Sequence, residues 1–155
     1  SELLLKGFKN DTRYYNNIII DNDKIYAFKD KKLYNFDYTT GDLISSINLT
    51  LSNDEDILIA FEYIDNSLFL SFKSGSIYRL NMDFEIIWIH ESKKKLNTQP
   101  FISNEQIILL YGDEIKGLRL EDGNQIWSET YQDMPIYQAS GGQVVSFFNI
   151  IYFTP

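Results

Sequence analysis

The side chains best suited to chemistry are few in this chain. It has 155 residues, a single histidine (His90) and no cysteine. A catalytic dyad or a metal site based on imidazole or thiolate therefore cannot be assembled from these residues alone. His90 follows Trp88 and Ile89 at the end of a predicted outer strand. We expect an ordinary exposed or edge position for it, with a chemical role only if residues outside the chain share in it.

Two acidic clusters could offer oxygen ligands to calcium. They are Asp21-Asn22-Asp23 and Asn53-Asp54-Glu55-Asp56. Neither continues into the alternating ligand spacing, with a glycine at the sharp turn, that a calcium loop requires. Asp and Asn are also favoured in turns, because their side chains bond to nearby backbone groups. We therefore predict turns between strands, and name no metal-binding residue.

Two glycine-containing segments and one basic run also fit turns and loops. Ser74-Gly75-Ser76 and Ser140-Gly141-Gly142 lack the following helix that a phosphate-binding loop requires, so we expect hairpin turns. Lys93-Lys94-Lys95 has no interleaved aromatic residue and is predicted to be a solvated loop. We name no catalytic or cofactor-binding residue, and expect no cofactor.

Charge and size exclude some classes of partner. The formal net charge is -8 and the isoelectric point is near 4.6. Nucleic acid and anionic membranes attract basic surfaces, so neither is the expected main partner. No apolar run approaches the ~18 residues of a transmembrane helix. A chain of this length can bury a core without disulfides or metals, which indicates a single domain.

Composition predicts an all-β protein. The chain has 21 isoleucines, only 3 alanines, and 24 aromatic residues (11 Tyr, 11 Phe and 2 Trp). β-Branched and aromatic side chains pack well on a pleated sheet and lose rotamer freedom in a helix. Short apolar runs alternate with clusters of Asp, Asn, Gly and Lys along the chain. This alternation is typical of an antiparallel meander.

The pattern repeats about every 40 residues. Gly41, Phe84 and Gly123 occupy matching turns, 43 and 39 residues apart, and the residues four positions later are Ser45, Trp88 and Trp127. Pro100-Phe101-Ile102 recurs as Pro135-Ile136-Tyr137, which begins a fourth unit. A repeat of this length with four short strands predicts β-propeller blades, each a four-stranded antiparallel sheet. A β-sandwich of about 14 strands is the alternative, but it does not explain the repeated offset.

The repeats predict about three and a half blades in one partial propeller domain spanning 1–155. Their approximate ranges are 12–50, 56–92 and 97–132, with 133–155 incomplete. At ~40 residues per blade, this is about half of a closed ring. Two hypotheses follow: the chain is a fragment of a longer protein, or two copies associate as a homodimer that completes a ring.

Three segments carry a resemblance to a known family. Asn35 to Ser45 resembles the pyrroloquinoline-quinone (PQQ) type propeller repeat, A-L-D-x-x-T-G-x-x-x-W. Leu118 to Trp127 resembles a second copy with Asp122 in place of the threonine. Tyr78 to Trp88 resembles a third copy that is one residue shorter in the turn, with Phe84 in place of the glycine. The resemblance covers about 130 residues.

The glycine and the tryptophan of this motif have physical roles that do not depend on the family. Gly41 and Gly123 can adopt positive φ in a tight turn, and a tryptophan on the last strand can then pack against the adjacent blade. We expect Gly41, Trp88, Gly123 and Trp127 to occupy equivalent blade positions. Trp127→Ala should cost about 3 to 5 kcal/mol if the indole is buried. Ser45 and Phe84 predict looser docking at two of the three junctions.

The resemblance implies a non-catalytic scaffold for protein–protein interaction. Members of this family without a cofactor include a periplasmic lipoprotein of the outer-membrane β-barrel assembly machinery, which binds its central protein. By resemblance, the expected location is periplasmic, with a lipid anchor outside this chain. The alternatives are part of a PQQ-dependent dehydrogenase propeller, which would hold PQQ and calcium, and a ligand-binding sensor propeller. Family members share the fold without sharing one function.

Overall fold

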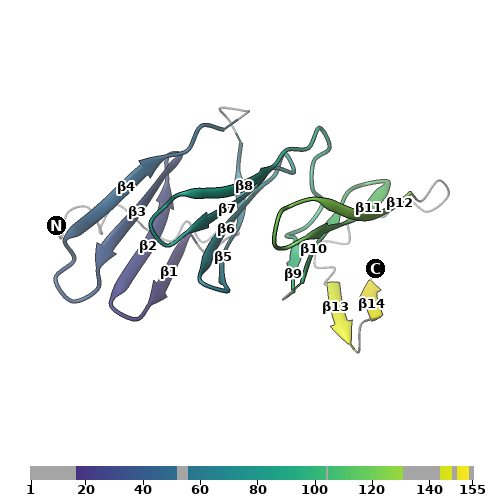
Figure 1. Cartoon of the computed structure of the whole chain (residues 1–155). Helices are drawn as coiled ribbons and strands as arrows, with labels where there is room; N and C mark the ends of the chain where they lie inside the picture. Colours follow the sequence, from purple (N-terminus) through teal and green to yellow (C-terminus); the bar gives the residue numbers. More distant parts are fainter. Residues whose placement is uncertain (1–16, 52–55, 104, 131–143, 148–149, 154–155) are drawn as a thin grey trace.

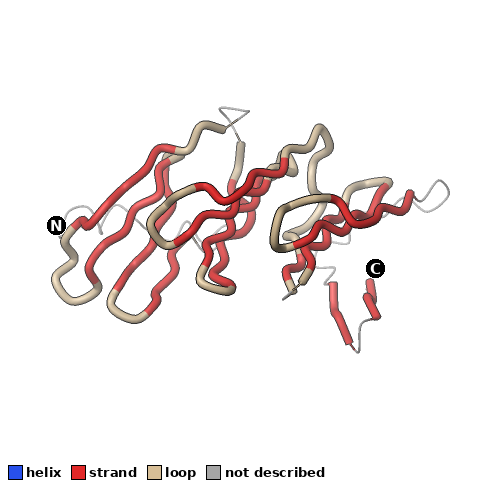
Figure 2. Tube along the Cα trace, in the orientation of Figure 1, coloured by secondary structure: helices blue, strands red, loops and turns tan. Residues whose placement is uncertain are grey.

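The described part of the chain forms antiparallel sheets and contains no helix (Figure 2). The computed structural model describes residues 17–51, 56–103, 105–130, 144–147 and 150–153. Its strands form three four-stranded sheets and one two-stranded sheet. The all-β prediction and the prediction of four-stranded blades are therefore confirmed.

The first two sheets follow the chain in simple meander order. Sheet one consists of β1 (Ile18–Asp21), β2 (Lys24–Lys29), β3 (Lys32–Asp37) and β4 (Leu43–Asn48). Sheet two consists of β5 (Leu58–Ile64), β6 (Ser67–Phe72), β7 (Ile77–Asn81) and β8 (Ile86–His90).

The third sheet repeats this order, and a hairpin follows it. Sheet three consists of β9 (Phe101–Ile102), β10 (Gln106–Leu110), β11 (Glu114–Arg119) and β12 (Gln125–Thr130). The hairpin consists of β13 (Val144–Phe147) and β14 (Ile150–Phe153). The three larger sheets lie in a row, and their fourth strands β4, β8 and β12 lie on the same side of it (Figure 1).

Turn chemistry explains why the strands pair as they do. Asp30-Lys31 and Asp65-Asn66 have positive φ at both positions, which matches the twist of two-residue hairpins. Asn22, in the first acidic cluster, also has positive φ and joins β1 to β2. Gly75 has a φ of 98° and connects β6 to β7. These segments are therefore turns, as expected, whereas 52–55 and 131–143 lie outside the described residues.

The hydrophobic core lies between neighbouring sheets. One cluster joins sheets one and two through aromatic side chains that include Tyr26, Phe72 and Phe84. A second cluster joins sheets two and three and includes Phe69, Trp88 and Tyr111. All six residues of β6 are buried, because its sheet has a neighbour on each side. A four-stranded sheet with two apolar faces needs such stacking to keep both faces dry.

The turn before each fourth strand contains one left-handed residue in all three sheets, although the β7–β8 turn is one residue shorter than the other two. Gly41, Phe84 and Gly123 have φ values of 72°, 68° and 70°. A register shift precedes this turn at the same place in each sheet, after Asn35, Arg79 and Gly117. The repeat inferred from the sequence is therefore a repeat of backbone geometry.

Phe84 corrects the expectation of loose docking at the first junction. It adopts the left-handed conformation despite its Cβ, which costs roughly 1–2 kcal/mol. Its ring is only 4% exposed and packs edge-on against Tyr26 of sheet one, with ring centroids 6.0 Å apart. Ser45, at the tryptophan position of sheet one, is exposed. In the motif the fourth strand carries the large tryptophan and the turn of the next sheet carries the small glycine. At this junction the sizes are exchanged: the strand carries Ser45, and the turn residue Phe84 supplies the aromatic ring.

This exchange can be tested by reversing it. Phe84→Gly should destabilise the protein by roughly 2–4 kcal/mol, because lost aromatic burial exceeds the relieved backbone strain. Adding Ser45→Trp should recover at least about 1 kcal/mol, since an indole then lies at the position from which Trp88 docks at the next junction. Urea unfolding of the single and double variants measures the coupling.

The matched control is Ser46→Trp in the Phe84→Gly background. Ser46 is the next residue of β4 and its side chain points to the opposite face of the sheet. It should give no rescue. Equal recovery from both tryptophans would contradict the exchange.

Candidate functional site

Trp88 forms the docking contact between sheets two and three. It is 8% exposed, and its Nε1 donates a hydrogen bond to the Leu120 carbonyl oxygen at 3.1 Å. A Cβ added to Gly123 would lie 2.7 Å from Trp88 Cε3, so the indole needs glycine at this turn. The sequence-based prediction of a tryptophan packed on the next blade is confirmed at this junction.

Trp127 occupies the equivalent register position but makes a different contact. It pairs with Gly117, as Trp88 pairs with Arg79 and Ser45 with Asn35. Its indole lies over Gly117 of its own sheet, where a Cβ would overlap the ring. Its Nε1 donates to Gln106 Oε1 at 3.2 Å, and the ring is only partly buried. The large loss of stability predicted for Trp127→Ala required a buried indole, and Trp88 meets that condition whereas Trp127 does not.

Arg79 reinforces the same junction from its place beside Trp88. Its NH1 donates to the carbonyl oxygens of Leu120 and Glu121 at 2.8 and 3.2 Å. Its Nε donates to Ser67 Oγ, and its guanidinium lies 5.5 Å from the centroid of the Phe69 ring. The Leu120 carbonyl thus accepts hydrogen bonds from both Trp88 and Arg79. Sequence reasoning missed Arg79, because the other two repeats carry Asn35 and Gly117 at the equivalent position.

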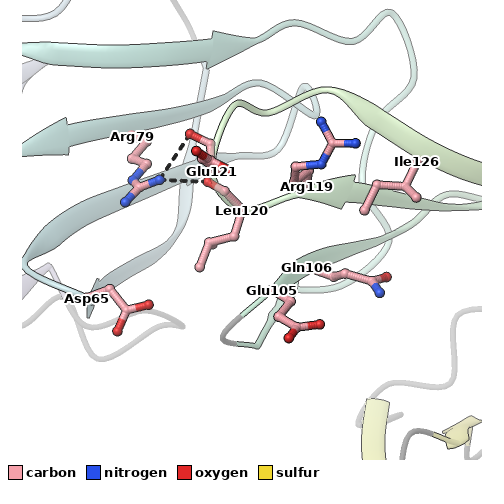
Figure 3. A pocket seen from close by; sticks show the side chains of 8 residues that line it. All are labelled: Asp65, Arg79, Glu105, Gln106, Arg119, Leu120, Glu121 and Ile126. Atoms are coloured by element: carbon pink, nitrogen blue, oxygen red, sulfur yellow. Dashed lines mark hydrogen bonds between the residues drawn. The ribbon is translucent and has the colours of Figure 1, made fainter.

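A cavity of about 430 Å³ lies next to this contact, between sheets two and three. Figure 3 shows Arg79 and Glu121 on one side of it and Arg119 and Ile126 on another. The remaining lining residues are Asp65, Glu105, Gln106 and Leu120. This volume lies within the range of small-ligand pockets. None of the lining residues was a candidate in the sequence, because the cavity arises only when two sheets stack.

His90 lies on the edge strand β8, but it is half-buried. Its Nε2 is buried and has no hydrogen-bond partner in the part of the chain that the structure describes. Desolvation lowers the pKa of its imidazole, and the positive charge of Lys116 on β11 lowers it further. The ring is therefore held neutral beside a lysine, which differs from the exposed position that the sequence suggested as one possibility.

Lys93, Lys94 and Lys95 are exposed in a loop, as predicted, and Lys94 also forms ion pairs. Its Nζ lies 2.9 Å from Asp113 Oδ1 and 3.0 Å from Glu114 Oε2, so it bridges the loop after sheet two to sheet three. These carboxylates raise the pKa of Lys94. Exposed ion pairs contribute little stability, so this bridge chiefly orients the loop.

Within the described residues, no group of three or more His, Asp or Glu side chains is arranged to hold a metal ion. No helix there is long and apolar enough to cross a membrane.

Comparisons with known proteins support the fold. No protein-family model and no curated protein matches the sequence. The computationally designed protein Ika4 superposes with a TM-score of 0.64 at 13% identity, over 88% of this chain and 81% of that protein.

Two natural proteins are also similar in structure. BamB from Moraxella catarrhalis gives a TM-score of 0.55 at 13% identity over 73% of this chain. A europium-containing methanol dehydrogenase gives 0.59 at 12% identity over 76% of this chain. The chain spans 35% of the length of BamB and 25% of the dehydrogenase. At such identities the comparisons support a β-propeller-like fold and nothing narrower.

The different roles of the two tryptophans predict different costs. Trp88→Ala should destabilise the protein by about 3–5 kcal/mol, because it removes a buried indole and its hydrogen bond to Leu120. Trp127→Ala should cost clearly less, since its ring is partly exposed on its own sheet. Denaturant unfolding of both variants makes the comparison, and equal costs would contradict the assignment of docking to Trp88.

His90 should make stability depend on pH. The unfolded chain takes up a proton near the ordinary pKa of 6.5, whereas the native ring resists protonation. Stability from this residue is therefore complete above pH 6.5, and decreases as the pH falls toward the lowered native pKa. His90→Gln should remove this component. Urea unfolding between pH 8 and 5 measures it, and parallel curves for the two proteins would show that His90 does not contribute.

Proposed function

We propose that the chain is a non-catalytic propeller scaffold that binds protein partners along the fourth strands of its blades. One observation carries this proposal: these strands are sheet edges and hold exposed aliphatic side chains. We call this set the rim stripe, and its members are 43–52% exposed. They are Leu43 and Ile44 on β4, Ile86, Ile87 and Ile89 on β8, and Ile126 on β12.

The rim stripe combines two features that favour a protein partner. An edge strand presents unpaired N–H and C=O groups that can pair with an added strand. Exposed aliphatic side chains beside it would be buried by that strand, and each apolar Å² removed from water contributes about 25 cal/mol. An extended segment with its own apolar residues is the partner that fits both features.

The finer proposal concerns outer-membrane β-barrel assembly in the periplasm. It rests on the likeness to BamB, a likeness of fold. It is therefore a fold-level analogy, to be tested with purified components.

The likeness to the methanol dehydrogenase supports a second candidate, part of a cofactor-dependent dehydrogenase. Titration with PQQ and calcium, followed by visible absorption, tests that candidate, and saturable binding with a spectral shift would favour it.

Ile87→Lys tests the rim stripe. Ile87 is 47% exposed on β8, so the change should leave the unfolding midpoint almost unaltered. Binding to the periplasmic domains of the central assembly protein should weaken by about tenfold or more, because a lysine ammonium would be desolvated in the contact. Biolayer interferometry with the immobilised partner measures the affinity.

The matched control is Ile20→Lys. Ile20 is 61% exposed on β1, at the opposite edge of its sheet from the rim stripe. It should retain full binding. No binding of the unaltered chain would contradict the role in assembly, and equal loss in both variants would contradict the rim stripe. Light scattering on the same samples shows whether two copies associate instead.

A further inference from the structure

The cavity between sheets two and three has an apolar floor and an acidic border. The Leu120 side chain is buried and Ile126 is 43% exposed. Asp65, on the β5–β6 turn, and Glu105, before β10, both border it from below in Figure 3 and come from different sheets. Glu121 borders it from the loop that follows β11. The opening is therefore lined by acids from two different sheets.

Both cationic side chains at the cavity are already engaged. Arg79 donates NH1 to two backbone carbonyl groups. Arg119 NH1 lies 2.7 Å from Asp122 Oδ2, so this arginine forms an ion pair with an aspartate outside the lining. Among the described residues, Asp65, Glu105 and Glu121 have no ion pair within 4.0 Å. Arg79 has no ion pair among the described residues either, so the lining has three unpaired carboxylates against one unpaired guanidinium, and this excess of negative charge favours a cation.

Gln106 offers the cavity a polar group that suits a peptide main chain. Gln106 Oε1 accepts the hydrogen bond from Trp127 Nε1, which fixes the amide and leaves its NH₂ group to donate. A donor of this kind can pair with a main-chain carbonyl group. The volume of about 430 Å³ exceeds that of one long side chain and leaves room for flanking backbone.

We propose that this cavity receives a lysine or arginine side chain from an extended segment of a partner protein. The cation lies at the border lined by Asp65 and Glu105, its methylene groups lie against Leu120 and Ile126, and the segment's backbone bonds to Gln106. The proposal rests on the scaffold function, which it deepens by naming the chemistry of the partner. The net charge of -8 favours the approach of such a segment over long range.

Both tryptophans report on this cavity. Trp88 Nε1 bonds to the carbonyl group of Leu120, which lines the cavity, and Trp127 Nε1 bonds to Gln106 on its other side. The two indole N–H groups therefore lie on either side of the cavity, and each gives its own signal in a proton–nitrogen NMR spectrum. Titration with the blocked peptide acetyl-Gly-Lys-Gly-amide should shift both signals in a saturable manner. The matched peptides with glutamate or norleucine in place of lysine should not.

The double variant Asp65→Asn, Glu105→Gln should weaken binding of the lysine peptide by about five- to tenfold, since two partly exposed charge contacts are lost. Asp30→Asn is the matched control. Asp30 occupies the same position in the β2–β3 hairpin as Asp65 in the β5–β6 hairpin, is exposed, and lies on sheet one. It should bind as the unaltered chain does.

Equal binding of the lysine and norleucine peptides, or an unchanged affinity in the double variant, would overturn the proposal. So would indole signals that do not move at any peptide concentration. Each of these results is independent of the rim-stripe measurement, which uses the whole partner and Ile87→Lys. If the lysine peptide does not bind but Ile87→Lys still weakens binding of the whole partner, only the cavity proposal is contradicted. If the whole partner does not bind either, the proposed scaffold function is contradicted as well.

Discussion

The fold depends on the need of each four-stranded sheet to have both faces covered. β6 illustrates the constraint, because all its residues are buried and its neighbours lie on both faces of its sheet. The distance at which the next sheet can approach is set by a single turn residue with left-handed backbone. At Gly123 the absence of a Cβ admits the indole of Trp88. The stacking interface therefore decides which residues the repeat must keep.

Each junction meets this constraint with different side chains. Between sheets two and three, an indole lies on glycine, and Arg79 adds hydrogen bonds to the loop at 120–121. Between sheets one and two, the ring comes from Phe84 on the turn itself, while Tyr78 OH donates to the Thr50 carbonyl oxygen at 2.9 Å. The two junctions therefore use aromatic rings from different positions of the motif, and in both the ring is buried between the sheets.

Much of the fold could be predicted from the sequence, and little of the site. β-Branched composition, turn residues and the 40-residue period predicted four-stranded antiparallel units, because these signals are local. The exchange of Ser45 and Phe84 could not be read from either residue, since it requires knowing that they belong to facing sheets. The cavity is hidden for the same reason. Asp65 and Glu105 are 40 residues apart in the sequence and border the same cavity only because their sheets stack.

The two binding surfaces are linked through one backbone carbonyl group. Leu120 oxygen accepts from both Trp88 and Arg79, and its side chain forms the floor of the cavity. A carbonyl oxygen has two lone pairs, so both bonds can be full hydrogen bonds at once. Trp88 also lies on β8, whose outward side chains Ile87 and Ile89 belong to the rim stripe. Ile126 belongs to both the cavity lining and the rim stripe, so the cavity and the rim are joined by a shared side chain on β12 as well as by the Leu120 carbonyl group.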